Sequence, residues 1–183
     1  MARLAEEDGL GALALRFTIL TCTRTGEAIG ARWSEINFAE KLWIIPAERM
    51  KMEREHRVPL ADAALEILRT VQRLPPSDFV FPANRRRPVS NMIMLMALRR
   101  MGRRGLTVHG FRSTFSDWCA ERTNFPSELR EMALAHAIGN KVEAAYRRGD
   151  LFQKRRQLMA AWARFATSPA PEGEVVPFVA AQE

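Results

Sequence analysis

Cations and one aromatic hydroxyl are the residues of this sequence best suited to act on a phosphate. Arg24 lies in the segment T-C-T-R-T-G-E, and His109 and Arg112 belong to H-G-F-R. His136 ends the segment A-L-A-H, and Tyr146, the only tyrosine, lies in V-E-A-A-Y-R-R-G-D. The transition state of phosphoryl transfer spreads negative charge over the non-bridging oxygens, so nearby cations stabilise it. This set of residue types therefore predicts cleavage of a phosphodiester.

Each of these residues also has an ordinary structural explanation. Arg24 could be a solvated loop arginine, His109 a capping residue and Tyr146 a packing residue of an amphipathic helix. Two arginines follow Tyr146 directly, which is a poor setting for burial in a core. A phenol has a reference pKa near 10, so it needs neighbouring cations to attack at neutral pH. The hypothesis of a tyrosine nucleophile therefore depends on the cations lying around it.

Further residues could support the reaction. Glu27 follows Arg24 by three positions and could orient it from the first turn of a helix. Lys51 lies in a basic loop, R-M-K-M-E-R-E-H-R-V-P-L. A desolvated lysine near a phosphate can protonate a leaving 5′ oxygen. Other arginines are predicted to contact backbone phosphates without taking part in the chemistry. They are Arg49, Arg54, Arg57, Arg85, Arg86 and Arg87.

The composition permits a nucleic-acid partner. The 183 residues carry a formal net charge of +7, and only four of the 28 basic residues are lysines, which leaves 24 arginines. Arginine presents a planar fork that pairs with phosphate oxygens, although a GC-rich genome would enrich arginine as well. No Cys/His spacing suggests zinc and no carboxylate cluster suggests magnesium, so we expect neither a metal nor a cofactor. Cys22 and Cys119 are expected to be buried free thiols in a reducing compartment.

No membrane association is expected. No apolar run approaches the roughly 18 residues that a membrane span needs. The N-terminal segment M-A-R-L-A-E-E-D places acids where a signal peptide would have a basic region. The sequence therefore predicts a cytoplasmic protein.

Apolar spacing predicts a mainly α fold with a small antiparallel β-sheet, in the α+β class. The sheet is a hairpin formed by residues 36–45 with a return strand near 58–60. The last 16 residues are rich in Pro, Ala and Glu, so residues 168–183 are expected to be a disordered tail after a single domain, 1–167. The expected helices cover residues 6–22, 26–33, 62–74, 90–103, 109–122, 127–136, 139–148 and 151–166.

Taken together, these segments resemble the catalytic domain of the tyrosine recombinase (phage integrase) family over about residues 10–165. T-R-T-G-E-A-I-G-A-R-W resembles the first arginine box of the family, and K-M-E-R-E-H-R-V-P-L its hairpin lysine segment. H-G-F-R resembles the H-x-x-R box, and L-A-H-A-I-G-N-K-V-E-A-A-Y-R-R-G-D the histidine and nucleophile boxes. The segments R-M-K-M, E-H-R-V-P-L and G-N-K-V-E-A-A-Y are similar in sequence to those of prophage integrases that insert at tRNA genes.

The resemblance implies site-specific recombination by DNA strand cleavage and rejoining, without metal or ATP. Arg24 and Arg112 would hold the scissile phosphate, and His136 would donate a further hydrogen bond to it. Tyr146 would form a 3′-phosphotyrosine bond that conserves the energy for rejoining. Lys51 would serve as the general acid toward the 5′ hydroxyl.

His109 would then assist proton transfer from the phenol. The pattern departs from the family in two places, since Ala135 stands where glycine is commoner and Ala61 where a capping serine is frequent. Full integrases also carry N-terminal arm-binding and core-binding domains, which we expect to be absent from this chain. The implied partner is double-stranded DNA carrying attachment sites, bound by a tetramer of the full-length protein, with the isolated chain a monomer.

Three other interpretations remain open from the sequence. A relaxing enzyme of the type IB topoisomerase kind shares the catalytic residue types. A catalytically incompetent DNA-binding remnant of a prophage integrase would keep the motifs without the activity. A helical protein with no nucleic-acid role would require all the motifs to coincide by chance.

Overall fold

The computed structural model describes residues 1–136 and 150–169. The predicted fold class is confirmed, because the described residues are mostly helical with a small antiparallel sheet. The predicted helix 139–148, Tyr146 and residues 170–183 of the tail lie outside the described residues. The helices are α1 (Ala2–Ala5), α2 (Leu10–Thr21), α3 (Thr25–Ile29), α4 (Asp62–Thr70), α5 (Met92–Arg100), α6 (Gly110–Arg122), α7 (Ser127–Ala133) and α9 (Phe152–Thr167), with 3₁₀ turns η1 (Trp33–Glu35) and η2 (Ala47–Arg49).

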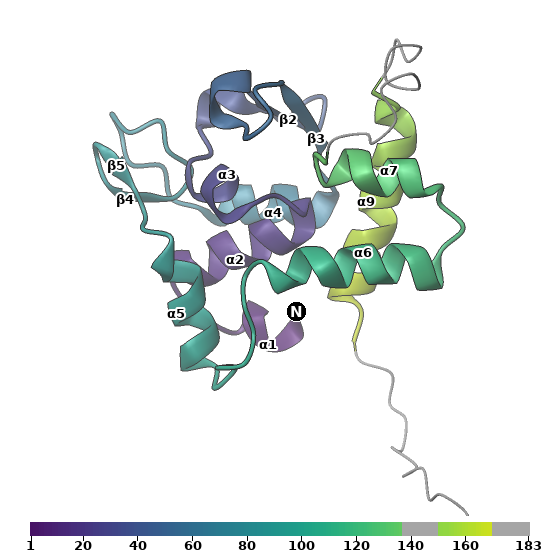
Figure 1. Cartoon of the computed structure of the whole chain (residues 1–183). Coiled ribbons are helices and arrows are strands. Elements are labelled where there is room, and N and C mark those ends of the chain that lie inside the picture. The colour runs from purple at the N-terminus through teal and green to yellow at the C-terminus, as the bar shows by residue number, and fades with distance from the viewer. Residues whose placement is uncertain (137–149, 170–183) are drawn as a thin grey trace, which may run out of the picture.

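Helix α2 lies at the centre of the molecule, as Figure 1 shows. Its sequence is apolar on every face, which is the pattern of a helix surrounded by other elements. It packs against α4, α5 and α9, and most of its residues are buried. The helix was predicted from residue 6, but it begins at Leu10 because Gly9 has a φ of +95°, outside the helical range.

Three short strands form the predicted antiparallel sheet, in the order β1 (Ile36–Asn37), β2 (Leu42–Ile45), β3 (His56–Pro59). In the register of the central pair, Trp43 lies opposite Val58 and Ile45 opposite His56. Trp43 is fully buried and its ring packs 5.2 Å from that of Phe17 in α2. This aromatic contact attaches the sheet to the core, so β2 and the strand β3 paired with it are positioned relative to α2.

A second hairpin, β4 (Pro82–Asn84) and β5 (Arg87–Pro88), was not predicted. Its turn is closed by the Asn84 side chain, whose Oδ1 accepts hydrogen bonds from the backbone N–H groups of Arg86 and Arg87. An Asx turn of this kind is a local sequence signal. Strands of two and three residues have no hydrophobic alternation, which is why periodicity missed them.

Helices α6 and α7 cross in front of α9 on the right of Figure 1. Aromatic rings hold α6 to α9, with Phe115 and Trp162 at 5.3 Å and Trp118 and Trp162 at 5.2 Å between centroids. The Trp162 indole N–H also donates to the Ile19 carbonyl of α2 at 2.8 Å. Trp162 of α9 thus contacts both α6 and the last part of α2.

Candidate active site

Arg112 is a buried arginine in the first turn of α6, with 5% of its surface exposed. Its Nη1 donates to the Cys22 carbonyl at the end of α2, and its Nη2 donates at 2.6 Å to the Leu134 carbonyl at the end of α7. Helix C-termini carry unpaired carbonyls and partial negative charge, so two of them form a favourable setting for a buried guanidinium. The position of Arg112 therefore depends on where two helices end.

We call residues 133–136 the α7 terminal turn. The His136 N–H donates to the Glu131 carbonyl at 3.0 Å, and Ala135 adopts a left-handed φ of +48°. This is the backbone arrangement in which many helices end, usually with glycine at the left-handed position. The left-handed conformation explains why glycine is commoner than alanine at this position. It also turns the carbonyls of Leu134 and Ala135 toward Arg112 and Arg24, respectively.

Arg24 reaches the same turn from the N-terminus of α3. Its Nη2 donates to the Ala135 carbonyl at 3.4 Å, although the two residues are 111 positions apart in sequence. The predicted contact with Glu27 is present, since Nη1 of Arg24 donates to Oε1 at 2.8 Å. The other oxygen, Oε2, accepts the backbone N–H of Arg24 at 2.8 Å. Glu27 is buried, so both its oxygens are used to hold one arginine.

The two arginines interact electrostatically. The pKa of Arg112 is lowered, first by burial and then by the positive charge of Arg24, while Glu27 raises it. Like charges this close repel, and an anion between or beside them would relieve that repulsion. The pair is therefore a candidate anion site, in which Arg24, with a quarter of its side chain exposed, is the more accessible member.

His136 completes the group and is the exposed member of it. Its Nε2 lies 3.3 Å from Nη2 of Arg112, and its Nδ1 lies 2.8 Å from Oε2 of Glu131. Arg24, Arg112 and His136, which we call the arginine site, are thus brought together at the α7 terminal turn. Glu131 was not anticipated from the sequence, although its place five residues before His136, at the end of the same helix, is a usable signal.

His56 is a second residue that the sequence analysis missed. It is buried at the start of β3. Its pKa is lowered to about 4, chiefly by burial and then by the positive charge of Arg155. Glu27 and a hydrogen bond to the Ala133 backbone raise the pKa, but by less. A histidine with so low a pKa is neutral at pH 7. It connects β3 to the α7 terminal turn and lies close enough to Arg112 for the two to interact electrostatically, without adding a further charge.

The structure does not place Lys51 and His109 in contact with the arginine site. Lys51 is exposed in the turn that follows η2, in the loop between β2 and β3. His109 is exposed at the N-cap of α6, where Thr107, not His109, accepts the Gly110 N–H. Residues three positions apart can share one face of a helix, but His109 is exposed and only Arg112 points into the protein.

Arg49 differs from the other predicted backbone contacts because its guanidinium is used inside the protein. Nη1 pairs with the Glu35 carboxylate, and Nη2 donates to the Glu27 carbonyl at 2.6 Å. A Cβ on Gly30 would lie 2.8 Å from Nη2, so the arginine also fills the space left by that glycine. Arg49 therefore holds the backbone of Glu27. Because its guanidinium is already paired inside the protein, a role as a phosphate contact is not favoured.

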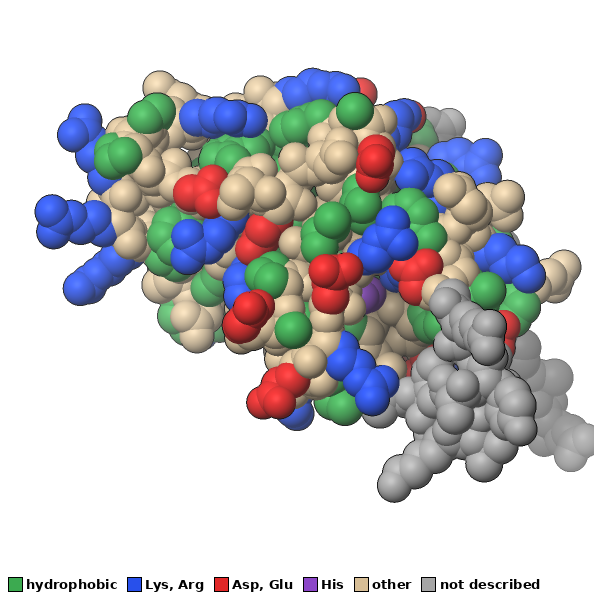
Figure 2. Space-filling view, turned by 90° about the horizontal axis from the view of Figure 1, so that it is seen from above, with side chains coloured by type: hydrophobic (Ala, Val, Ile, Leu, Met, Phe, Trp, Pro, Cys, Tyr) green, Lys and Arg blue, Asp and Glu red, His purple; other side chains and the backbone are tan. Residues whose placement is uncertain are grey.

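The remaining predicted contacts lie on the surface. Arg54 and the three arginines of the β4–β5 turn, Arg85 to Arg87, are exposed. Figure 2 shows Lys and Arg side chains projecting at the left edge, the side on which the β4–β5 hairpin lies in Figure 1. Arg57 is half-buried, with its guanidinium 4.5 Å above the Phe152 ring and Nη1 3.3 Å from Asp150. Arg57 is thus partly engaged within the protein.

The chain on the C-terminal side of Tyr146 is attached to β3. The buried Arg155 donates to the Asp150 carbonyl and carboxylate, at 2.8 Å each, and to the Arg57 carbonyl at 2.7 Å. Asp150 is therefore held by a buried arginine of α9. This contact fixes Asp150, four residues beyond the predicted nucleophile.

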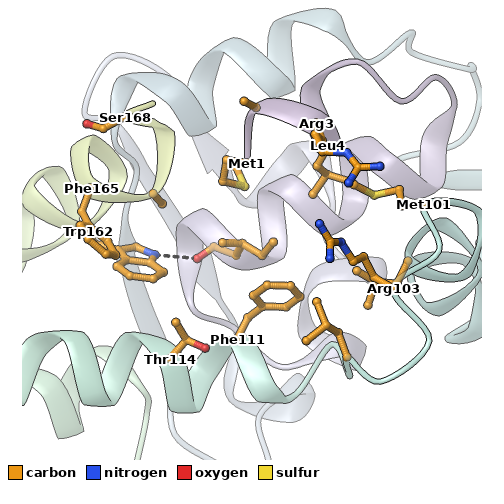
Figure 3. Close-up of a pocket in the computed structure, with 15 residues that line it drawn as sticks. Met1, Arg3, Leu4, Met101, Arg103, Phe111, Thr114, Trp162, Phe165 and Ser168 are labelled. Carbon is orange, nitrogen blue, oxygen red and sulfur yellow. Dashed lines mark hydrogen bonds between the residues drawn. The ribbon is translucent and has the colours of Figure 1, made fainter. Parts of the chain in front are cut away.

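A separate cavity of about 440 Å³ opens between α1, α6 and α9 (Figure 3). Its lining is mostly apolar and includes Leu4, Phe111 and Trp162. None of Arg24, Arg112 and His136 lines it. Two arginines, Arg3 and Arg103, belong to its lining, but the cavity holds none of the residues that converge on the α7 terminal turn, so it is not the candidate active site.

Over residues 1–136 and 150–169, no group of three or more His, Cys, Asp or Glu side chains could hold a metal ion. Within the same residues, no helix has the length and apolar character needed to cross a membrane. Cys22 and Cys119 are both free and buried, as predicted. Burial raises the pKa of the Cys22 thiol well above its usual value.

Comparison with known proteins shows the family to which this sequence belongs. A sequence model described as the phage integrase family matches residues 7–151. The chain belongs to the phage integrase family. Among relatives of this phage integrase domain, prophage integrase IntA of Escherichia coli K12 is 42% identical over 162 residues, and the integrase of Shigella phage Sf6 is 34% identical over 154 residues. The matches cover 86% and 81% of this chain, respectively, and 39% of each relative.

A solved structure shares the fold of this phage integrase domain. It is a lambda integrase dimer bound to a COC′ core site, with a TM-score of 0.54 and 19% sequence identity. The match covers 84% of this chain and 54% of the other. The present chain spans about two fifths of the length of the two integrases compared with it in sequence.

Proposed function

We propose that this chain is the catalytic domain of a site-specific recombinase that cuts and rejoins double-stranded DNA through Tyr146. The observation that carries the proposal is the convergence of Arg24, Arg112 and His136 on the α7 terminal turn. Cleavage of a phosphodiester without a metal requires such a cationic site for one phosphate. The family membership and the integrase relatives support the same conclusion.

In the proposed reaction, the arginine site holds the non-bridging oxygens of the scissile phosphate. The Tyr146 phenolate attacks phosphorus, and the bond from phosphorus to the 5′ oxygen breaks. The phenol proton leaves with the help of His109, and Lys51 gives a proton to the departing 5′ oxygen. Attack by a 5′ hydroxyl on the phosphotyrosine reverses these steps, so rejoining needs no external energy.

Arg112 can bind the scissile phosphate although several of its N–H donors already have partners within the protein. A guanidinium carries five N–H donors, and the contacts with Cys22, Leu134 and His136 use Nη1 and Nη2. Its remaining N–H groups can serve an anion lying beside Arg24. Because the protein holds both guanidiniums before DNA arrives, little reorganisation is needed when the phosphate binds.

The domain boundaries remain part of the proposal. Residues 1–167 would form the catalytic domain, while arm-binding and core-binding functions would belong to segments outside this sequence. We infer that the isolated domain is a monomer in the cytoplasm and that the complete protein acts as a tetramer on attachment-site DNA. Insertion at a tRNA gene would follow from the similarity to prophage integrases.

A covalent adduct is the direct test of this function. The protein is incubated at low salt with a pool of nicked duplexes that have a randomised core, and protein-linked DNA is recovered under denaturing conditions and sequenced. We expect the wild type to yield an enriched core sequence and Tyr146→Phe to yield no adduct. An adduct that persists in Tyr146→Phe excludes Tyr146 as the nucleophile. No adduct from the wild type would favour the alternative of a DNA-binding remnant.

The exposed arginines of the β4–β5 turn are proposed backbone contacts, and salt dependence tests them. Each phosphate that a cation neutralises contributes about 0.9 to the slope of log affinity against log salt. Replacing all three turn arginines by alanine should therefore reduce the slope clearly. A control that removes three exposed cations elsewhere should leave the slope nearly unchanged if the contacts are specific; it combines Arg69→Ala, Lys154→Ala and Arg164→Ala.

A further inference from the structure

A carboxylate faces the functional histidine from the last turn of α7. Oε2 of Glu131 lies 2.8 Å from Nδ1 of His136, and the backbone carbonyl of Glu131 accepts the His136 N–H at 3.0 Å. The left-handed Ala135 folds the chain back so that both contacts form at once. Glu131 therefore holds His136 by its backbone and by its ring.

The carboxylate is itself held in one orientation. Its second oxygen, Oε1, accepts a hydrogen bond from Nε of Arg130 at 3.0 Å. Partial burial raises the pKa of Glu131, but the hydrogen bonds from His136 and Arg130 outweigh it and the pKa is lowered overall. Glu131 is therefore ionised at neutral pH, with both oxygens engaged as acceptors.

These contacts determine where the imidazole carries its proton. An ionised carboxylate can only accept hydrogen bonds, so the hydrogen atom between the two side chains belongs to Nδ1 of His136. The other ring nitrogen, Nε2, then points to Nη2 of Arg112 at 3.3 Å. In the neutral ring Nε2 accepts from Arg112. When Nε2 is protonated as well, the ring can donate to a phosphate oxygen while Glu131 balances its charge.

We propose that Glu131 is a positioning residue of the phosphate site, which fixes the Nδ1–H form of His136 and directs Nε2 toward Arg112 and the scissile phosphate. The functional consequence of this assignment rests on the proposed DNA cleavage, whereas the ring geometry does not. The arrangement resembles other sites where a carboxylate selects the tautomer of a histidine that acts on a ligand.

The first test reads the tautomer directly by ¹⁵N NMR of the histidine rings in the free protein. The chain has only three histidines, so His109→Gln and His136→Gln are sufficient to assign the signals. The wild type should show His136 in the Nδ1–H form when neutral. Glu131→Gln keeps an acceptor oxygen and should retain that form. Glu131→Ala should lose it, and an unchanged Nδ1–H signature in Glu131→Ala would overturn the proposal.

The second test measures single-turnover cleavage of the core selected by the adduct assay. Glu131→Ala should be about 10-fold to 100-fold slower, the range typical when a partner that orients a functional histidine is removed. Glu131→Gln should fall between Glu131→Ala and the wild type. Glu66→Ala removes the same charge from an exposed position of α4 and should cleave at the wild-type rate.

The outcomes of the two tests separate this inference from the proposed function. A wild type that forms no adduct contradicts the proposed cleavage, and the NMR result still decides the tautomer. Cleavage at a normal rate in Glu131→Ala, in which the Nδ1–H form is absent, would show that His136 does not need this orientation and would overturn the positioning role. Thermal unfolding of each variant confirms that it is folded, which is expected since Glu131 is partly exposed.

Discussion

The arginine site and the basic loops hold cations in opposite ways. In the arginine site, Arg112 is buried and its donors are bound to carbonyls at two helix ends. In the loops, Lys51 and the arginines of the β4–β5 turn are exposed. The described contacts of the arginine site hold its cations in place before any DNA is present. The loop cations lack comparable restraint among the described residues.

This difference suggests that the two groups of cations have different functions. Fixed cations stabilise a transition state best, because they need not reorganise when charge develops. Exposed cations suit the DNA backbone, whose phosphates are contacted mainly for affinity and position. Lys51 is the exception, since its proposed role is chemical although its loop is exposed. Variants of both regions test this difference, with expected effects from about 1000-fold in cleavage rate to about 1 kcal/mol in stability.

Loss of Arg112 should have the largest effect. Arg112→Ala removes the buried cation and leaves the Cys22 and Leu134 carbonyls without their donor. We expect single-turnover cleavage to fall by about 1000-fold, as when a preorganised donor is removed from an active site. Arg112→Lys keeps the charge but cannot span the same acceptors, and it should remain about 100-fold impaired.

Arg164→Ala, in the last turn of α9, is the control for a simple change of charge and should cleave normally. If Arg112→Lys cleaved at the wild-type rate, positive charge alone would suffice, and the contrast between fixed and exposed cations would lose its basis.

Replacement of Lys51 should be the next largest effect. If Lys51 protonates the 5′ oxygen, Lys51→Ala should slow cleavage by about 100-fold. A substrate with sulfur at the 5′ bridging position should restore the rate, because a thiolate leaves without being protonated. Lys154→Ala provides a matched exposed lysine in α9. A Lys51→Ala defect that sulfur does not relieve would assign Lys51 to DNA binding, like the other loop cations.

The low pKa of His56 predicts that the stability of the folded protein depends on pH. Its pKa of about 4 in the folded protein lies below the unfolded value near 6.5, so the unfolded chain binds more protons as the pH falls. Stability from neutral His56 is therefore complete above pH 6.5 and is lost toward pH 4. Between pH 7 and pH 5 the loss should be about 2 kcal/mol.

Urea unfolding of the wild type and of His56→Gln at both pH values measures this contribution as a difference. Carboxylates titrate in both proteins and cancel in the comparison. His109→Gln, which changes an exposed histidine, should keep the wild-type pH dependence. An equal pH dependence in His56→Gln would show that His56 is not a neutral support of the site.

Ala135→Gly should give the smallest change, and it should be stabilising. Alanine at a φ of +48° costs about 1 kcal/mol that glycine avoids. The melting temperature should rise by about 2–4 °C for a domain of this size. Ala133→Gly, in a helical position at the end of α7, should instead lower stability by about 1 kcal/mol. Destabilisation by Ala135→Gly would mean that the turn does not need the left-handed conformation.

Much of the fold was predictable because its elements follow local rules. The central helix, the hairpin and the helix starts near Asp62, Gly110 and Ser127 appear in the apolar spacing and in the breaks between elements. The predicted helix 62–74 ends at Thr70, where the Thr70 hydroxyl bonds to the Ile67 carbonyl and the next residue is extended. Such endings depend on a few backbone angles, which periodicity does not determine.

The sequence by itself predicted Arg24, Arg112 and His136 as site cations, together with Lys51 and His109, because each stands in a short motif at a helix end or a turn. Only the tertiary structure decided which of them meet and what holds them. It buried Arg112 between two helix ends and turned Arg49 inward to Glu35. It also brought His56 to the backbone of Ala133 and Glu131 to the ring of His136. The contacts of the arginine site include one between Arg24 and Ala135, 111 positions apart, and the desolvation and hydrogen bonding at the site arise only when the helix termini meet.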